Sequence, residues 1–129
     1  MPDVNRGDRP LSPFMIGPYY RPQLTSITSI FVRITGNALG VAGLLVVWWL
    51  LAAATSAEYF AVADAVLTSW FGDLVLFLSL WALWYHMLGG LRHLYWDQGG
   101  SLDVALAEKM GKGMIAGSVV LTILTALVL

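Results

Sequence analysis

Three long windows without a charged residue constrain what this chain can fold into. Residues 34–57, 74–91 and 113–129 contain no Asp, Glu, Lys or Arg and span 24, 18 and 17 residues. A membrane-spanning helix needs about 20 predominantly apolar residues. Charged residues make up only 12% of the chain, against roughly 25% in a soluble domain. The pattern therefore predicts an all-α membrane protein with three transmembrane helices, and it excludes an ordinary soluble domain and a disordered chain.

The basic residues are placed asymmetrically around these windows. Four precede the first window and three lie between the second and the third, namely Arg6, Arg9, Arg21 and Arg33, then Arg92, Lys109 and Lys112. The connection 58–73 has no basic residue and carries three acidic ones. Because Lys and Arg are enriched in cytoplasmic segments, we expect the N-terminus inside, the loop at 58–73 outside and the C-terminus outside.

A cleaved signal peptide is a competing interpretation of the first window, since the small residues at 52–57 resemble a cleavage site. Signal peptides are normally about 15–30 residues long in total. Here 33 polar and mixed residues precede the apolar run. We therefore expect this window to be retained as a membrane span.

The proline distribution separates an N-terminal arm from the helical part. All five prolines lie in residues 1–24, which we predict to form an extended arm at the inner membrane face, because proline fixes φ and lacks an N–H donor. Residues 25–129 form the predicted anchor domain, with spans at about 28–54, 72–94 and 106–129. In the outer loop, apolar residues recur at helical spacing and predict a short interfacial helix: Tyr59, Val62, Ala63, Val66, Leu67 and Trp70.

His86 is an ionisable residue inside the second predicted span. It precedes Arg92 by six residues, which places it about 9 Å deeper in the membrane at ~1.5 Å per residue. An axial histidine is what the iron of a b-type haem needs. Gly90 and His93 share its helix face, and a glycine there leaves room for a flat macrocycle. His93, Arg92 and Arg33 lie nearer the aqueous edge, at a depth that suits haem propionates.

Two other roles of His86 remain open at this stage, a hydrogen bond to a neighbouring helix and a proton relay. The number of histidines limits how this chain alone could bind a haem iron. The chain has two histidines, and His86 and His93 on one helix cannot bind a single iron from opposite faces. A bis-histidine haem would therefore take its second ligand from another chain.

Ser29 and Arg33 form a second polar pair, one helical turn apart at the inner end of the first span. A hydroxyl and a guanidinium that face an apolar pocket could hold the carbonyl oxygen of a quinone, and the positive charge would favour its reduced, anionic form. In the competing interpretation, Ser29 bonds to its own helix backbone and Arg33 reaches to the interface.

Three blocks of sequence resemble a known family, the cytochrome b membrane-anchor subunit of succinate dehydrogenase (respiratory complex II). The first is the arm, with RPLSP at 9–13 and YRPQLTS at 20–26. The second is SIFVRITG at 29–36, which is similar to the family's Ser-Ile-Leu-His-Arg-x-[Ser/Thr]-Gly. The third, at 86–97, follows the family's His-x-x-x-Gly-x-Arg-His-x-x-x-Asp. The resemblance covers essentially the whole chain.

The resemblance implies a role for each matching residue. His86 matches the axial ligand of haem b. Ser29 and Arg33 match residues at the ubiquinone pocket, and Arg33, Arg92 and His93 match the haem propionate side.

Two positions depart from the family pattern. Val32 stands where the motif usually has histidine, and Phe14 stands where related forms often have one. Neither departure touches the axial ligand. Asp97 matches an acidic position at the inner edge, with a role in proton uptake or structure.

The resemblance also implies the function and the partners. We expect a membrane-anchor subunit of a succinate:ubiquinone oxidoreductase in the bacterial inner membrane, with the mitochondrial inner membrane as the alternative. Its partners would be a flavoprotein, an iron–sulfur subunit, a second membrane subunit that shares haem b, and the lipid bilayer, with no nucleic acid. The chain would not be catalytic alone. The alternatives are the anchor of a quinol:fumarate reductase, another haem–quinone membrane complex, or a haem-free structural membrane subunit.

Overall fold

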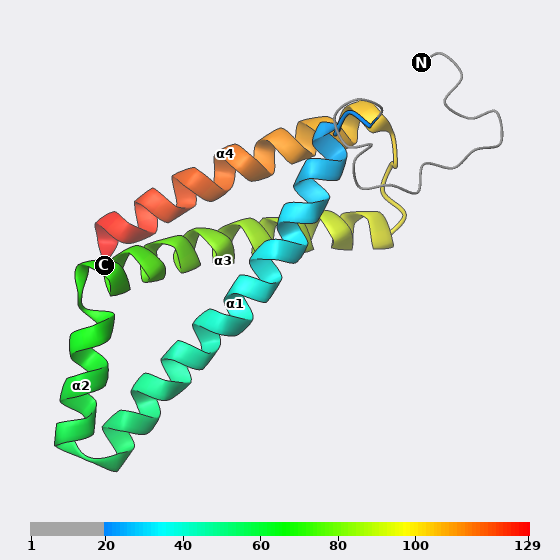
Figure 1. The fold of residues 1–129 in the computed structure, drawn as a ribbon. Helices are drawn as coiled ribbons and strands as arrows, with labels where there is room; N and C mark the ends of the chain where they lie inside the picture. Colours follow the sequence, from blue (N-terminus) through cyan, green and yellow to red (C-terminus); the bar gives the residue numbers. More distant parts are fainter. Residues whose placement is uncertain (1–19) are drawn as a thin grey trace.

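The structure, a computed structural model, describes residues 20–129 of the chain. They form four helices, α1 (Leu24–Thr55), α2 (Ala57–Leu67), α3 (Trp70–Asp97) and α4 (Val104–Val128), which Figure 1 labels. Helices α1, α3 and α4 are each long and apolar enough to cross a membrane. The predicted fold class, an all-α membrane protein with three transmembrane helices, is confirmed. The predicted orientation in the membrane stays a prediction.

Helix α1 begins close to the end of the predicted N-terminal arm, most of which lies outside the described residues. The N–H of Gln23 donates to Ser26 Oγ at 3.1 Å, and the Ser26 hydroxyl donates to the Gln23 carbonyl at 2.8 Å. The first of these bonds gives the Gln23 N–H a partner at the helix start, where N–H groups have no intrahelical acceptor. Helix α1 then continues for 32 residues, about 48 Å at ~1.5 Å per residue, which exceeds a hydrocarbon core of about 30 Å.

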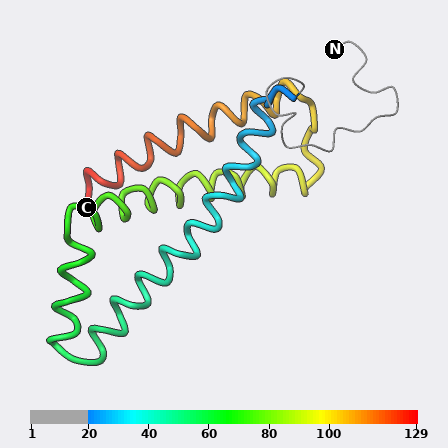
Figure 2. Tube along the Cα trace, viewed as in Figure 1, coloured from blue at the N-terminus to red at the C-terminus, as the bar shows by residue number. Residues whose placement is uncertain are grey.

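The long helices are arranged as an antiparallel pair and a crossing helix. Helices α3 and α4 run side by side, and α1 crosses α3 in its first half and then diverges from it (Figures 1 and 2). Helix α2 joins the far end of α1 to the beginning of α3. The crossing brings the first turns of α1 against the second half of α3, where most of the predicted site residues lie.

Indole N–H groups of α3 bond to hydroxyls of α4 along their shared face. Trp81 Nε1 donates to Ser118 Oγ at 3.2 Å, and Trp84 Nε1 donates to Thr125 Oγ1 at 3.0 Å. Helix association in a membrane depends on close packing and interhelical hydrogen bonds, because lipid is as apolar as the side chains. These bonds therefore fix the register of α3 against α4.

The helix expected in the connection between the first two spans is present as α2. Ser56 caps it by accepting from the N–H of Tyr59 at 3.1 Å. The helix ends at Leu67, and Trp70, which the apolar spacing assigned to it, is the first residue of α3 instead. The reason is local: Ser69 caps α3 by accepting from the N–H of Gly72 at 3.1 Å. The interfacial position of α2 stays a prediction.

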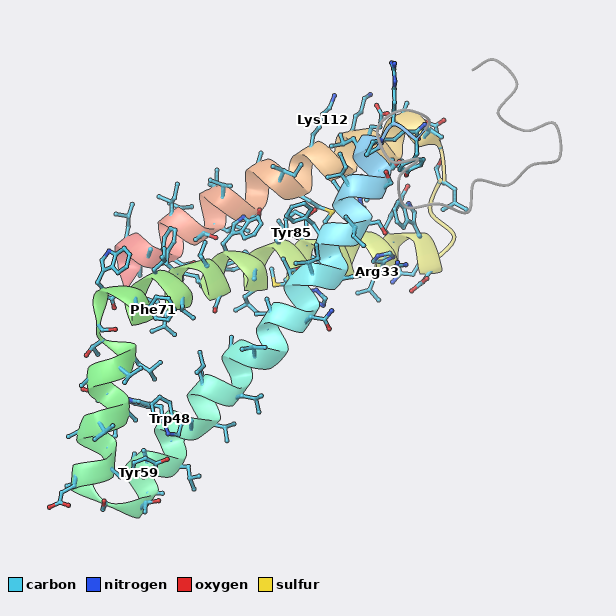
Figure 3. The ribbon with its side chains drawn as sticks, in the orientation of Figure 1. Arg33, Trp48, Tyr59, Phe71, Tyr85 and Lys112 are labelled. Atoms are coloured by element: carbon cyan, nitrogen blue, oxygen red, sulfur yellow. The ribbon has the colours of Figure 1, made fainter. Side chains whose placement is uncertain are left out.

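The turn between α2 and α3 is tight enough to require glycine at position 72. A Cβ atom there would lie 2.3 Å from the Leu67 carbonyl oxygen, which is backbone and cannot move aside. At the other end of α2, the indole N–H of Trp48 in α1 donates to the Tyr59 hydroxyl at 2.8 Å, and Figure 3 shows the two side chains together. Helix α2 is therefore fixed at both ends.

Large apolar side chains cover much of the outside of the bundle. Only 6% of the most apolar stretch of α1 is buried within the chain, against 22% for α4. Such a surface is stable only when lipid or another apolar chain covers it. Helix α1 is thus the span that its own chain covers least.

Candidate functional site

His86 lies where α1 crosses α3, and its ring bonds to the backbone of α1. Its Nδ1 is 2.9 Å from the carbonyl oxygen of Val32. Because a carbonyl oxygen can only accept, Nδ1 carries the ring proton of the neutral imidazole and Nε2 keeps its lone pair. Metal-ligating histidines commonly donate their other ring N–H to a backbone carbonyl in this way. The hydrogen bond to a neighbouring helix, which the sequence left as an alternative to ligation, is therefore compatible with ligation.

The imidazole approaches α1 closely because Gly36 has no side chain. A Cβ atom built on Gly36 would lie 2.9 Å from Cε1 of His86 and 3.3 Å from its Nδ1. Atoms of this kind are normally about 3.5–4.0 Å apart at their best separation. The ring is thus seated directly on the α1 backbone.

Two adjacent glycines of α3 have different surroundings. A Cβ atom on Gly89 would lie 2.6 Å from Cγ2 of Val32, so Gly89 packs against α1. A Cβ atom on Gly90 would meet nothing within 4 Å in the described chain. Gly90 is one turn from His86 on the same helix face, so a free space lies beside the imidazole. That a flat macrocycle occupies this space stays a prediction.

Arg92 is buried between helices, with 3% of its surface exposed. Its Nη1 donates to Thr28 Oγ1 in α1 at 3.1 Å, and its guanidinium lies 4.8 Å from the centre of the Trp96 ring. The Tyr85 hydroxyl donates to the carbonyl oxygen of Thr28 at 3.1 Å, and Figure 3 shows Tyr85 beside the point where α1 crosses α3. Arg92 thus joins α3 to α1, about a third of a turn around α3 from His86.

His93 and Asp97 lie further along α3 and are both exposed. The His93 ring packs edge-on against Trp96, with 5.4 Å between the ring centres. His93 is two turns from His86 on the same face, and the structure therefore groups it with Gly90 rather than with Arg92.

The buried cluster of Thr28, Tyr85 and Arg92 was not predicted as a unit. From the sequence, Thr28 is interpreted as a residue at the start of a helix, and Tyr85 as one of many apolar positions in the second span. One sequence feature could have indicated this cluster. A charged residue near the inner end of the second span, Arg92, lies at the same depth as a hydroxyl residue of the first span, Thr28.

Ser29 and Arg33 line the same cavity on the first turns of α1. The cavity has a volume of 580 Å³ and is bounded mainly by apolar and aromatic side chains, including Tyr20, Ile30 and Phe31. Binding sites for small molecules commonly enclose about 300–1,000 Å³ and combine apolar walls with a few polar groups. The structure therefore brings together the two side chains that the sequence analysis assigned to a quinone.

These features define a class of protein: a helical membrane subunit with a half-buried histidine that bonds to a neighbouring helix, and a separate cavity lined by a hydroxyl and a guanidinium. A sequence model of the succinate dehydrogenase/fumarate reductase transmembrane subunit matches residues 5–125. The chain belongs to this family, and the resemblance stated from the three sequence blocks is confirmed.

Curated relatives agree with this assignment. The chain is 54% identical over 99% of its length to the succinate dehydrogenase cytochrome b556 subunit of Paracoccus denitrificans, of which it covers 97%. It is 35% identical over 90% of its length to the subunit of that name from Rickettsia conorii, of which it covers 89%. A cytochrome b560 subunit from Marchantia polymorpha is 34% identical, over 81% of this chain and 78% of the relative. With three apolar helices and these bacterial relatives, the chain is an integral inner-membrane protein.

Proposed function

We propose that this membrane anchor of succinate dehydrogenase supplies one axial ligand, His86, to a haem b. The observation that carries the proposal is the hydrogen bond from His86 Nδ1 to the Val32 carbonyl, which leaves Nε2 available as the ligand atom. The relatives from Paracoccus denitrificans and Rickettsia conorii are cytochrome b556 subunits, which supports haem b as the cofactor. Bound haem would supply a reversible one-electron centre within the membrane.

The surroundings of His86 fit a large planar group. Gly90 leaves free space on the same helix face, and His93 follows one turn nearer the end of α3. We assign His93, Arg33 and Arg92 to the propionate side, because cationic and N–H donors bind carboxylates well. Arg92 is the least accessible of the three, because only 3% of its surface is exposed and its Nη1 already donates to Thr28 Oγ1.

The second axial ligand would come from another membrane subunit. His86 and His93 lie on one face of α3 and cannot reach opposite sides of a single iron. A shared haem would therefore lie between this chain and a second haem-ligating anchor subunit. The sparse coverage of α1 by its own chain provides an apolar surface for such a subunit.

The cavity of Ser29 and Arg33 is proposed as this chain's part of the ubiquinone site. The Ser29 hydroxyl would donate to a quinone carbonyl oxygen, and the nearby Arg33 guanidinium would stabilise the negative charge that reduction brings. The apolar walls would hold the ring and exclude water.

The chain would perform no chemistry alone. In the assembled complex, oxidation of succinate to fumarate in a flavoprotein partner releases two electrons and two protons. The electrons pass through an iron–sulfur partner to ubiquinone, which takes up two electrons and two protons to form the quinol. The family includes fumarate reductases, but the two bacterial relatives are subunits of succinate dehydrogenases, which favours succinate oxidation.

The test is a spectrum of the assembled complex, purified through a tag on this chain. We expect b-type bands in the dithionite-reduced minus oxidised spectrum, and reduction of ubiquinone by succinate in the same sample. If the complex retains its partner subunits but shows no such bands, His86 does not ligate a haem and the proposal is wrong. A complex with b-type bands that does not oxidise succinate would point to another haem–quinone assembly.

A further inference from the structure

We infer that Gly36 is a positioning residue. Because it has no side chain, the His86 imidazole can pack against the α1 backbone, where its Nδ1 bonds to the Val32 carbonyl. The inference rests on the proposed haem ligation by His86. Gly36 lies in α1, four positions after Val32, whereas the proposed ligand His86 lies in α3.

The first step is steric. A Cβ atom on Gly36 would lie 2.9 Å from Cε1, 3.3 Å from Nδ1 and 3.7 Å from Nε2 of His86. A methyl group there would therefore clash with Cε1 and crowd Nδ1, whereas Nε2 would stay at an ordinary contact distance. The α1 backbone is held by its own helical hydrogen bonds, so the imidazole must rotate or retreat.

The second step is the hydrogen bond. The Val32 carbonyl that accepts from Nδ1 lies one turn before Gly36, on the same side of α1. A ring displaced by a methyl group at position 36 loses the 2.9 Å distance or the alignment of this bond, and hydrogen bonds weaken steeply when bent. The contact uses the main chain of Val32, so it does not depend on the histidine that the family usually has at this position.

The third step links the bond to the iron. Hydrogen bonding of the outer ring nitrogen raises the basicity of the ligating nitrogen and fixes the plane of the ring. Second-shell hydrogen bonding is one of the means by which a protein sets the potential of a haem. A weaker Nδ1 bond makes Nε2 a poorer donor to the oxidised iron, so the reduction potential of the haem rises.

Gly40 provides a matched control on the same face of α1. It follows Gly36 by one turn, and a Cβ atom there would meet nothing within 4 Å in the described chain. The two glycines therefore differ in their contact with His86 and share their helix and their face.

The experiment compares Gly36→Ala and Gly40→Ala in the intact complex with its partner subunits. For Gly36→Ala we expect a more positive haem midpoint potential and a displaced low-spin EPR signal, since that signal depends on the orientation of the imidazole planes. Gly40→Ala should match the wild type in both. A wild-type potential and EPR signal in Gly36→Ala would overturn the inference, as would equal shifts in the two variants.

If the Gly36→Ala complex does not assemble, the double variant Gly36→Ala/His86→Ala tests the inference instead. Removal of the ring removes the clash, so the double variant should assemble as well as His86→Ala alone. If His86→Ala assembles and the double variant does not, Gly36 is needed for a reason other than its contact with His86, and the inference is wrong. Absence of haem from the wild-type complex would instead defeat the proposed function.

Discussion

Nδ1 of His86 and the carbonyl oxygen of Val32 lie 2.9 Å apart, so the imidazole itself bonds α3 to α1 at their crossing. The bond has two consequences. It directs the lone pair of Nε2 away from the Val32 carbonyl, and it makes the position of the ring depend on how α1 sits against α3. The site is therefore built from two helices even though its ligand comes from one.

Removal of the Ser29 hydroxyl tests the quinone cavity. In Ser29→Ala we expect the KM for ubiquinone to rise roughly fivefold, because a lost hydrogen bond to the substrate costs about 1 kcal/mol. Reduction of a soluble dye by succinate should stay near the wild-type rate, since that reaction does not need the membrane site. Steady-state kinetics of the purified complex with each acceptor measure both quantities.

Ser79→Ala is the control for Ser29→Ala. The Ser79 hydroxyl donates to the carbonyl of Val75 in its own helix at 2.7 Å and lies away from the cavity, so its removal should leave the quinone KM unchanged. Identical quinone kinetics in Ser29→Ala and the wild type would exclude Ser29 from the site.

Filling the space beside His86 tests the proposed haem face. In Gly90→Leu, a side chain would occupy the free space one turn from the ligand, and we expect the haem content per complex to fall several-fold. Gly43→Leu introduces the same side chain at an α1 glycine that also faces free space, and it should retain haem. Haem content is measured by the pyridine haemochrome method against protein. Full haem occupancy in Gly90→Leu would show that no macrocycle lies there.

The bond between Arg92 and Thr28 predicts a stability effect. Thr28→Val removes the hydroxyl that accepts from Arg92 Nη1 at 3.1 Å and leaves a buried guanidinium with one bond fewer. An unsatisfied buried donor costs about 1–3 kcal/mol. We therefore expect a shorter half-life of the complex at elevated temperature, followed by loss of activity.

Thr55→Val serves as the comparison for Thr28→Val. Its hydroxyl is exposed and donates only to the Leu51 carbonyl in its own helix at 2.7 Å, so the half-life should change little. Equal half-lives for Thr28→Val and Thr55→Val would mean that the Arg92 contact does not stabilise the crossing.

The charge-free windows were sufficient to predict the three spans, because the cost of burying charge in lipid is large and local in sequence. The boundary between α2 and α3 was misplaced at Trp70, since the apolar spacing continues through the turn that Ser69 and Gly72 create. Periodicity reports which residues share a face, whereas a cap and a tight backbone contact decide where a helix ends.

The contacts between helices were harder to predict than the helices. The sequence placed His86, Gly90 and His93 on one face, which depends only on the helical repeat. It did not pair His86 with Gly36 or Arg92 with Thr28. Those pairs depend on the depth and angle at which α1 crosses α3, and neither quantity is encoded in the spacing of one helix.

The central claim is that His86 ligates a haem iron, and the most direct test is the spectrum of the complex that carries His86→Leu. The variant complex is purified with its partners, its subunit composition is verified, and its reduced minus oxidised spectrum is recorded beside that of the wild type. The account predicts b-type bands in the wild type, and their loss or a change of spin state in His86→Leu. A wild-type spectrum with full haem content in His86→Leu would contradict it.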